Sequence, residues 1–124
     1  MSVFRQRVTA AFLGSVLIAA AWAQTEQKAK RVRGSALHAL LAESQFSDDA
    51  HFTYRFRRDG QFTGTELGRD IRGTWRIRND KMCMTWIRPP GREECYVVRK
   101  MGVEISFFVN GSEAWYGQLK KAAP

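Results

Sequence analysis

The sequence contains few of the residue types that most often carry catalytic or metal chemistry, with two histidines and two cysteines among 124 residues. The histidines, His38 and His51, fall in different predicted elements, and the adjacent Glu93 and Glu94 point to opposite faces of a strand. No nucleophile or acid–base group therefore has a predicted partner beside it. We expect a protein that is not an enzyme and that uses no cofactor.

Soft metal ligands occur together once, where Met82, Cys83 and Met84 precede Cys95, and such ligands favour copper(I). Strand alternation sends the two methionines to one face and Cys83 to the other, so the four residues do not converge on one ion. We expect core methionines beside a disulfide, and no metal site.

A hydrophobic run long enough to span a membrane is also missing. The longest apolar run, residues 8–21, has about 14 residues, whereas a spanning helix needs about 20. Arg5 and Arg7 precede it and an Ala-x-Ala motif ends at Ala23, which is the order of a cleaved bacterial secretory signal. We predict that residues 1–23 are a signal peptide. The mature protein is then periplasmic or secreted, without a transmembrane span.

The two cysteines, Cys83 and Cys95, both lie in the predicted mature chain, and an even number in an exported protein favours a disulfide. Closing a loop of about 13 residues stabilises a fold by about 3 kcal/mol. Such a link suits a domain of roughly 100 residues, whose hydrophobic core is modest.

Acidic residues are in the minority, since the formal net charge is +8, and loss of Arg5 and Arg7 with the signal leaves +6. Nucleic acid is scarce outside the cytoplasm, so we expect no nucleic-acid partner. The basic charge favours an anionic cell-envelope polymer or an acidic protein as partner. A charge that serves solubility alone fits the composition equally well.

Residues 24–33 (QTEQKAKRVR) are polar and basic, and they are predicted to form a flexible leader. In the segment GSALHALLAES that follows, Ser35 is a candidate N-cap, and Leu37, Leu40 and Leu41 recur at helical spacing. One short helix is expected here. It should cover one end of a single β domain formed by residues 34–121.

From His51 onward the apolar period is two, with turn signals about every ten residues, which is typical of an antiparallel meander. The predicted strands are 51–57, 61–67, 70–78, 81–87, 93–99, 103–109 and 113–120. We therefore expect a mainly β fold, a small antiparallel meander or barrel of about seven strands with one short N-terminal helix. Gly64, Gly68 and Gly73, in or beside strands, favour a closed and curved sheet.

Turn chemistry sets the register of these strands. A two-residue Asp59-Gly60 turn would mix the faces, so we predict a three-residue loop that pairs Phe56 with Phe62. A turn centred on Pro89 places Cys83 opposite Cys95. The other predicted pairs are Arg55 with Thr63, Ile77 with Met82, Trp75 with Met84, Thr85 with Glu93 and Trp86 with Arg92.

This register divides the side chains between two faces. The predicted core face contains Phe52, Tyr54, Phe56, Phe62, Ile71, Trp75, Ile77, Met82, Met84, Trp86, Tyr96 and Val98. The other face carries five candidate anion-binding arginines, Arg55, Arg57, Arg72, Arg76 and Arg78. Arginine makes bidentate contacts with phosphate and carboxylate, although arginines also decorate the solvent side of any basic sheet.

Four segments in order, LHALLAES, FTYRFRRDGQFTG, IRGTWRIRNDKMCMTW and EECYVVRK, carry a family resemblance. With the final hairpin they resemble a group of small secreted alphaproteobacterial proteins of uncharacterised function, over residues 34 to about 117. That family often has a glycine at the helix exit, where this chain has Glu43 and Ser44. The resemblance implies an exported, lipocalin-like small barrel, and it brings no known activity or binding residues.

The favoured function is a periplasmic binding or interaction protein that engages an anionic envelope component or an acidic protein through the arginine face. The alternative is a lipocalin-like carrier of a small apolar ligand. Against a carrier, five bulky aromatics are expected to fill the interior: Trp75, Trp86, Tyr54, Phe56 and Phe62. A secreted inhibitor that acts through the exposed loop 88–91 is a third possibility.

Overall fold

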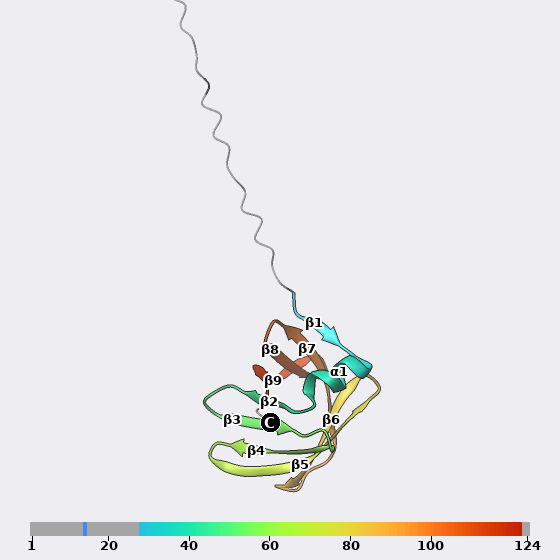
Figure 1. Ribbon diagram of the computed structural model, residues 1–124, viewed down its shortest axis with the longest axis vertical. Coiled ribbons are helices and arrows are strands. Elements are labelled where there is room, and N and C mark those ends of the chain that lie inside the picture. Colours follow the sequence, from blue (N-terminus) through green and yellow to red (C-terminus); the bar gives the residue numbers. More distant parts are fainter. Residues whose placement is uncertain (1–13, 15–27, 123–124) are drawn as a thin grey trace, which may run out of the picture.

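The structure is a computed structural model that describes Gly14 and residues 28–122 (Figure 1). The predicted signal peptide, apart from Gly14, and residues 24–27 of the predicted leader lie outside the described residues. Within the described part of the chain, no helix is both long and apolar enough to cross a membrane.

Eight antiparallel strands form a closed barrel in up-and-down order (Figure 1). They are β2 (Ser44–Ser47), β3 (Phe52–Phe56), β4 (Gln61–Glu66), β5 (Arg69–Arg78), β6 (Lys81–Arg88), β7 (Glu94–Met101), β8 (Glu104–Val109) and β9 (Ser112–Lys121). The barrel closes because β9 pairs with β2 as well as with β8. Closure pairs the edges that an open sheet of this size would leave exposed.

The seven predicted strands correspond to β3 through β9, and the structure adds two short ones. β2 closes the barrel, while β1 (Lys30–Val32) pairs with the C-terminal half of β7, beyond the residues that pair with β6. The predicted leader therefore overlaps a strand at residues 30–32. Strands of three and four residues are too short to show a recognisable alternation.

The predicted short helix is α1 (Gly34–Leu41), which covers one end of the barrel. Its buried residues, Leu37 and Leu41, are fully inaccessible to solvent and belong to the core. The predicted N-cap at Ser35 is wrong, because the cap position is Arg33, which makes no side-chain capping bond. Gly34, at φ +56°, turns the chain directly from β1 into the helix, so Ser35 already lies in the first turn.

The predicted register is confirmed in three hairpins. Phe56 lies opposite Phe62, Ile77 opposite Met82, and Cys83 opposite Cys95. The predicted pairs Thr85–Glu93 and Trp86–Arg92 are wrong, because β6 and β7 pair only as far as Met84 and Glu94. Beyond that point, β6 remains paired with β5 through a bulge, which sets Trp86 opposite Gly73 and Arg88 opposite Arg72.

The core face is largely as predicted, and Phe46 of β2 and Phe107 of β8 join it. Gly73 shows how closely its large side chains pack: a Cβ atom there would lie 2.5 Å from the ring of Phe62 and 2.1 Å from the carbonyl oxygen of Thr85. Only glycine allows Phe62 to lie across β5 at this point. The aromatic packing therefore constrains the backbone as well as the side chains.

The up-and-down order places the connections alternately at two ends of the barrel. The α1 end contains the helix and the connections 57–60, 79–80 and 102–103. The open end contains the connections 48–51, 67–68, 89–93 and 110–111. The two ends differ in packing, since α1 covers only the first of them.

Candidate functional site

The open end of the barrel holds a hollow of about 400 Å³, called here the open-end hollow. Five strands or their ends contribute to its wall, which includes Glu66, Trp86, Glu94, Tyr96, Val109 and Trp115. Most of these residues continue the inward-facing positions of their strands; Glu66, for example, follows Phe62 and Gly64 on β4. Pockets that hold small molecules in proteins have volumes of about 300–1,000 Å³, so this one is of adequate size.

Of the five aromatics expected to fill the interior, Tyr54, Phe56, Phe62 and Trp75 are buried in the core. Phe56, Phe62 and Trp75 do fill the half next to α1, where the indole Nε1 of Trp75 donates to the carbonyl of Arg57 at 2.8 Å. Trp86 instead stands in the wall of the hollow and is only half-buried. Two other wall positions carry carboxylates, the half-buried Glu66 and the exposed Glu94.

Two buried tyrosines hold the two carboxylates of the hollow. The Tyr54 hydroxyl donates to Glu66 Oε1, and the Tyr96 hydroxyl donates to Glu94 Oε2 at 3.0 Å. Both tyrosines are 2 % exposed, so their donor groups are fixed by the packing around them. In the described residues, neither carboxylate forms an ion pair with a lysine, arginine or histidine.

The environment of the hollow raises the pKa values of two of these groups, Glu66 and Tyr96. Burial raises the pKa of Glu66. Burial also raises the pKa of the Tyr96 phenol, and the hydrogen bond to Glu94 and the charges of Glu94 and Glu66 raise it further against an opposing hydrogen bond with Trp115. Tyr96 therefore remains a protonated donor at neutral pH. Glu66, Glu94 and Tyr96 all line the open-end hollow.

The open end is acidic although the sequence as a whole is basic. Seven carboxylates lie on its connections or on the adjoining strand ends, namely Asp48, Asp49, Glu66, Asp70, Glu93, Glu94 and Glu113. Three arginines accompany them, Arg69, Arg88 and Arg92. Within the described residues, Glu66 and Glu94 are among the carboxylates of this end that have no ion-pair partner, whereas Glu93 is bound by Arg76 and Arg78.

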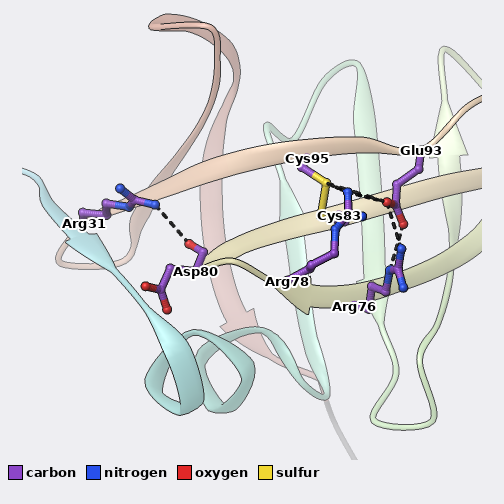
Figure 2. The surroundings of a disulfide bond; sticks show 7 residues. All are labelled: Arg31, Arg76, Arg78, Asp80, Cys83, Glu93 and Cys95. Carbon is purple, nitrogen blue, oxygen red and sulfur yellow. Dashed lines mark hydrogen bonds and ion pairs between the residues drawn. A yellow bond between two sulfur atoms is a disulfide. The ribbon is translucent and has the colours of Figure 1, made fainter.

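The five candidate arginines are all exposed on the outer face, as the alternation predicts. Arg76 and Arg78 both bind Glu93, at N–O distances of 2.9 Å (Figure 2). The hydrogen bonds from Arg76 hold the pKa of Glu93 below its ordinary value. Arg55 and Arg57 are also near carboxylates, at 3.9 Å from Glu43 and 3.7 Å from Asp59, respectively. Four of the five candidates therefore already have a negative partner.

Arg72 differs from the other candidates. It lies directly opposite Arg88 across β5 and β6, and both line a second hollow of about 250 Å³ together with Thr63 and Asp70. Neither arginine forms an ion pair within residues 28–122. The sequence did not indicate Arg88 as part of this group, because the bulge that brings it to the outer face leaves no sequence signal of its own.

The Sγ atoms of Cys83 and Cys95 lie 2.03 Å apart, at disulfide distance, on the outer face (Figure 2). Arg78 Nη2 lies 3.6 Å from Cys95 Sγ, and Glu93 is close enough that the two sulfurs and its carboxylate fall within 4.8 Å of one another. As a disulfide, the sulfurs bond to each other rather than to an ion. Met82 and Met84 face the barrel interior, so the methionines and cysteines separate as predicted.

The two histidines lie at opposite ends of the barrel. His38 of α1 stacks on Trp75, with ring centroids 5.3 Å apart. His51 Nδ1 pairs with Asp48 Oδ2 at 2.7 Å in the connection between β2 and β3. Burial opposes the charge of Asp48, but backbone N–H groups, led by that of Phe52, and the His51 ring hold its pKa well below the ordinary value. These contacts shape the loop.

From the sequence alone, Glu66 and Glu94 were not predicted to line the same hollow. A signal was nevertheless present, because Glu66 has the inward parity of Phe62, and Glu94 has the inward parity of Tyr96. A carboxylate at a core-face position near a strand end indicates either a buried pair or a lined opening.

Comparison with known proteins found no matching family model, no matching curated protein and no matching solved structure.

Proposed function

We propose that this protein is an exported carrier that binds a small molecule in the open-end hollow. The observation that carries the proposal is the hollow itself, about 400 Å³ in volume and walled by Trp86 and Trp115 beside Glu66 and Glu94. Eight-stranded barrels are wide enough to hold one small ligand. A concave site with aromatic walls and a few convergent polar groups is the usual form of a ligand pocket.

The closure of only one end of the barrel by α1 supports this function. Leu37 and Leu41 of α1 close one end, so a ligand would enter and leave only through the other. The tyrosine–carboxylate hydrogen bonds fix polar groups in the wall before any ligand arrives. A site ordered in advance binds with less loss of conformational entropy.

Nuclear magnetic resonance of the indole N–H groups tests the carrier proposal. A library of small cations, anions and neutral compounds is added to the ¹⁵N-labelled protein. We expect at least one compound to shift the Trp86 and Trp115 signals while the Trp75 signal stays in place, because Trp75 Nε1 is bonded to Arg57 at the α1 end. If no compound moves the Trp86 or Trp115 signals at saturating concentration, the carrier proposal fails.

A second function is supported by the pair of Arg72 and Arg88. Two like charges directly opposite each other across strands destabilise a sheet, and an anion bound between them would offset the repulsion. This pair could hold an anionic cell-envelope polymer against the outer face. Such binding should weaken steeply between low and moderate salt, because the charges are exposed.

The salt-dependent binding is tested with purified lipopolysaccharide. Arg72→Gln should reduce binding, whereas Arg76→Gln, which removes the same charge from a residue already paired with Glu93, should reduce it less. Equal losses in the two variants would mean that net charge alone is responsible. Binding that does not depend on salt would exclude this function.

A further inference from the structure

Two carboxylates share the open-end hollow without a countercharge. Glu66 and Glu94 lie on its wall, and no cationic side chain in the described part of the chain is within ion-pair distance of either. Glu66 is half-buried and Glu94 is exposed, and as like charges that line one hollow they repel each other. A positively charged ligand would relieve this repulsion, and an anionic ligand would add to it.

The aromatic walls of the hollow also suit a cation. Trp115 makes edge contacts with Phe52 and Tyr54, at centroid distances of 5.1 and 5.3 Å, and Trp86 makes one with Phe62 at 5.6 Å. These contacts hold both indoles in place. Tryptophan is the best aromatic partner for a cation, and the interaction strengthens where water is excluded.

The charge around the mouth favours the approach of cations. The open end has seven carboxylates, and although Arg76 and Arg78 bind Glu93, Glu66 and Glu94 have no ion-pair partner among the described residues. The remaining positive charge is concentrated elsewhere, notably at the α1 end, where Lys30, Lys120 and Lys121 lie. A cation that approaches the protein is therefore directed to the open end rather than to the α1 end.

An organic cation fits the hollow better than a metal ion does. Ca²⁺ takes about six to eight oxygen ligands. The hollow offers two carboxylates, and each already accepts a hydrogen bond from a tyrosine. An ammonium group needs fewer partners, because its N–H groups can donate to the remaining lone pairs of the carboxylates. The apolar wall, which includes Val109, would cover the body of such a ligand.

We infer that the open-end hollow binds an organic amine, with its ammonium group between Glu66 and Glu94 and its apolar body between Trp86 and Trp115. This inference rests on the proposed carrier function and names the class of its ligand. Tyr54 and Tyr96 act as positioning residues, because they hold the two carboxylates rather than contact the amine.

Three probes that share one apolar body test the charge requirement: phenethylamine, 2-phenylethanol and 3-phenylpropionate. Isothermal titration calorimetry on the full protein at neutral pH should show binding of the amine, with affinity at least about tenfold above that for the alcohol, since a charge-assisted hydrogen bond is stronger than a neutral one. The carboxylate should not bind measurably.

Charge-neutralising variants then locate the site. Glu66→Gln and Glu94→Gln should each weaken amine binding by about tenfold or more. Glu113→Gln removes the same charge from an exposed residue on β9 outside the wall, and it should leave affinity within about twofold. Circular dichroism and the thermal midpoint of each variant identify any that fails to fold, and the three-probe comparison on the unaltered protein does not depend on them.

The outcomes separate the inference from the function on which it rests. If the alcohol or the carboxylate binds as tightly as the amine, or if Glu66→Gln and Glu94→Gln bind it unchanged, the amine inference is wrong and the carrier function stands. If none of the three probes binds while library compounds still shift the Trp86 and Trp115 signals, the same conclusion follows. If those signals never move, both proposals fail.

Discussion

The Tyr96 hydroxyl donates to Glu94 Oε2 at 3.0 Å in the wall of the open-end hollow. Tyr96 is almost completely buried, whereas Glu94 is exposed at the mouth, so the hydrogen bond joins the core to the candidate site. The same relationship recurs between Tyr54 and Glu66. Packing deep in the barrel thereby fixes the carboxylates that line the open-end hollow.

Tyr96→Phe tests this relationship. The variant keeps the ring in the core and removes the donor to Glu94, which remains accessible to water. We expect stability to fall by about 1 kcal/mol or less, because only one hydrogen bond to a solvated acceptor is lost. Amine affinity should fall several-fold, because Glu94 is no longer held in place.

Urea unfolding and calorimetry measure the two effects separately. A matched control is Tyr116→Phe, which removes a hydroxyl from an exposed tyrosine on β9 outside the hollow. A loss of stability without any change in amine affinity would show that Tyr96 serves the core alone.

The pH dependence of stability should show the effect of the raised pKa of Glu66. Because burial raises the pKa of Glu66 in the folded state, the protonated form favours folding. This contribution is fully present below the ordinary value of 4.5 and is lost as pH rises through the higher, folded-state pKa. In Glu66→Gln that part of the pH dependence should disappear.

Urea unfolding of the two proteins between about pH 4 and 8 provides the comparison, since glutamate and its shifted forms titrate in this range. The difference in stability between Glu66→Gln and the unaltered protein should grow in favour of the variant as pH rises. A difference that is constant, or that grows as pH falls, would contradict the raised pKa.

Ligand binding should depend on pH in the opposite direction. The proposed amine needs Glu66 ionised, so its affinity should fall as the solution is acidified. The fall should begin above the pH at which an ordinary glutamate titrates, because the pKa of Glu66 is raised. Amine binding that stays constant down to the ordinary glutamate range would argue against a role for Glu66 in holding the ligand.

The disulfide should contribute to stability and not to the site. Cys83 and Cys95 are separated by 12 positions, and a closed loop of this length stabilises a fold by about 3 kcal/mol. The double variant Cys83→Ser/Cys95→Ser should lose about this amount in urea unfolding. Amine affinity should be retained wherever the variant is folded, because neither cysteine lines the open-end hollow. Loss of affinity in a folded variant would contradict this separation.

The sequence predicted the parts of the fold that local chemistry determines. The loop around Gly60 fixes the pair Phe56–Phe62 and the connection 79–80 fixes Ile77–Met82. The turn predicted around Pro89 placed Cys83 opposite Cys95, and the structure confirms this pair. These relationships depend on short stretches of chain. From each turn, side-chain alternation determines which residues pair and which face they occupy along the rest of the hairpin.

The parts that could not be predicted depend on contacts between distant segments. β1 forms because Lys30–Val32 pair with β7, and a segment of three residues has no sequence pattern that would predict this pairing. The hollow likewise depends on barrel closure, which brings Glu66 of β4 and Glu94 of β7 into one wall. Their inward parity was visible in the sequence, but the bulk of the aromatics suggested a filled interior. The bulge in β6, which turns Arg88 outward, was equally hidden.

Lys121 should stabilise the α1 end. Its Nζ donates to the carbonyl oxygens of Ala39, Leu40 and Ala42 at 2.7, 3.3 and 3.0 Å at the C-terminal end of the helix. The Leu40 carbonyl also accepts a hydrogen bond from Ser44 Oγ, so Lys121 matters most for Ala39 and Ala42. A positive charge at this end of a helix also interacts favourably with the helix dipole. Lys121→Met should lower stability by about 1 kcal/mol, because the side chain is partly in solvent.

The neighbouring Lys120→Met is the matched control. Lys120 is exposed on β9 and donates to none of the helix carbonyls, so its loss should change the thermal midpoint little. Amine affinity should be unaffected in both variants, because α1 and the hollow lie at opposite ends of the barrel. If Lys120→Met destabilised the fold as much as Lys121→Met, net charge rather than capping of α1 would explain the effect.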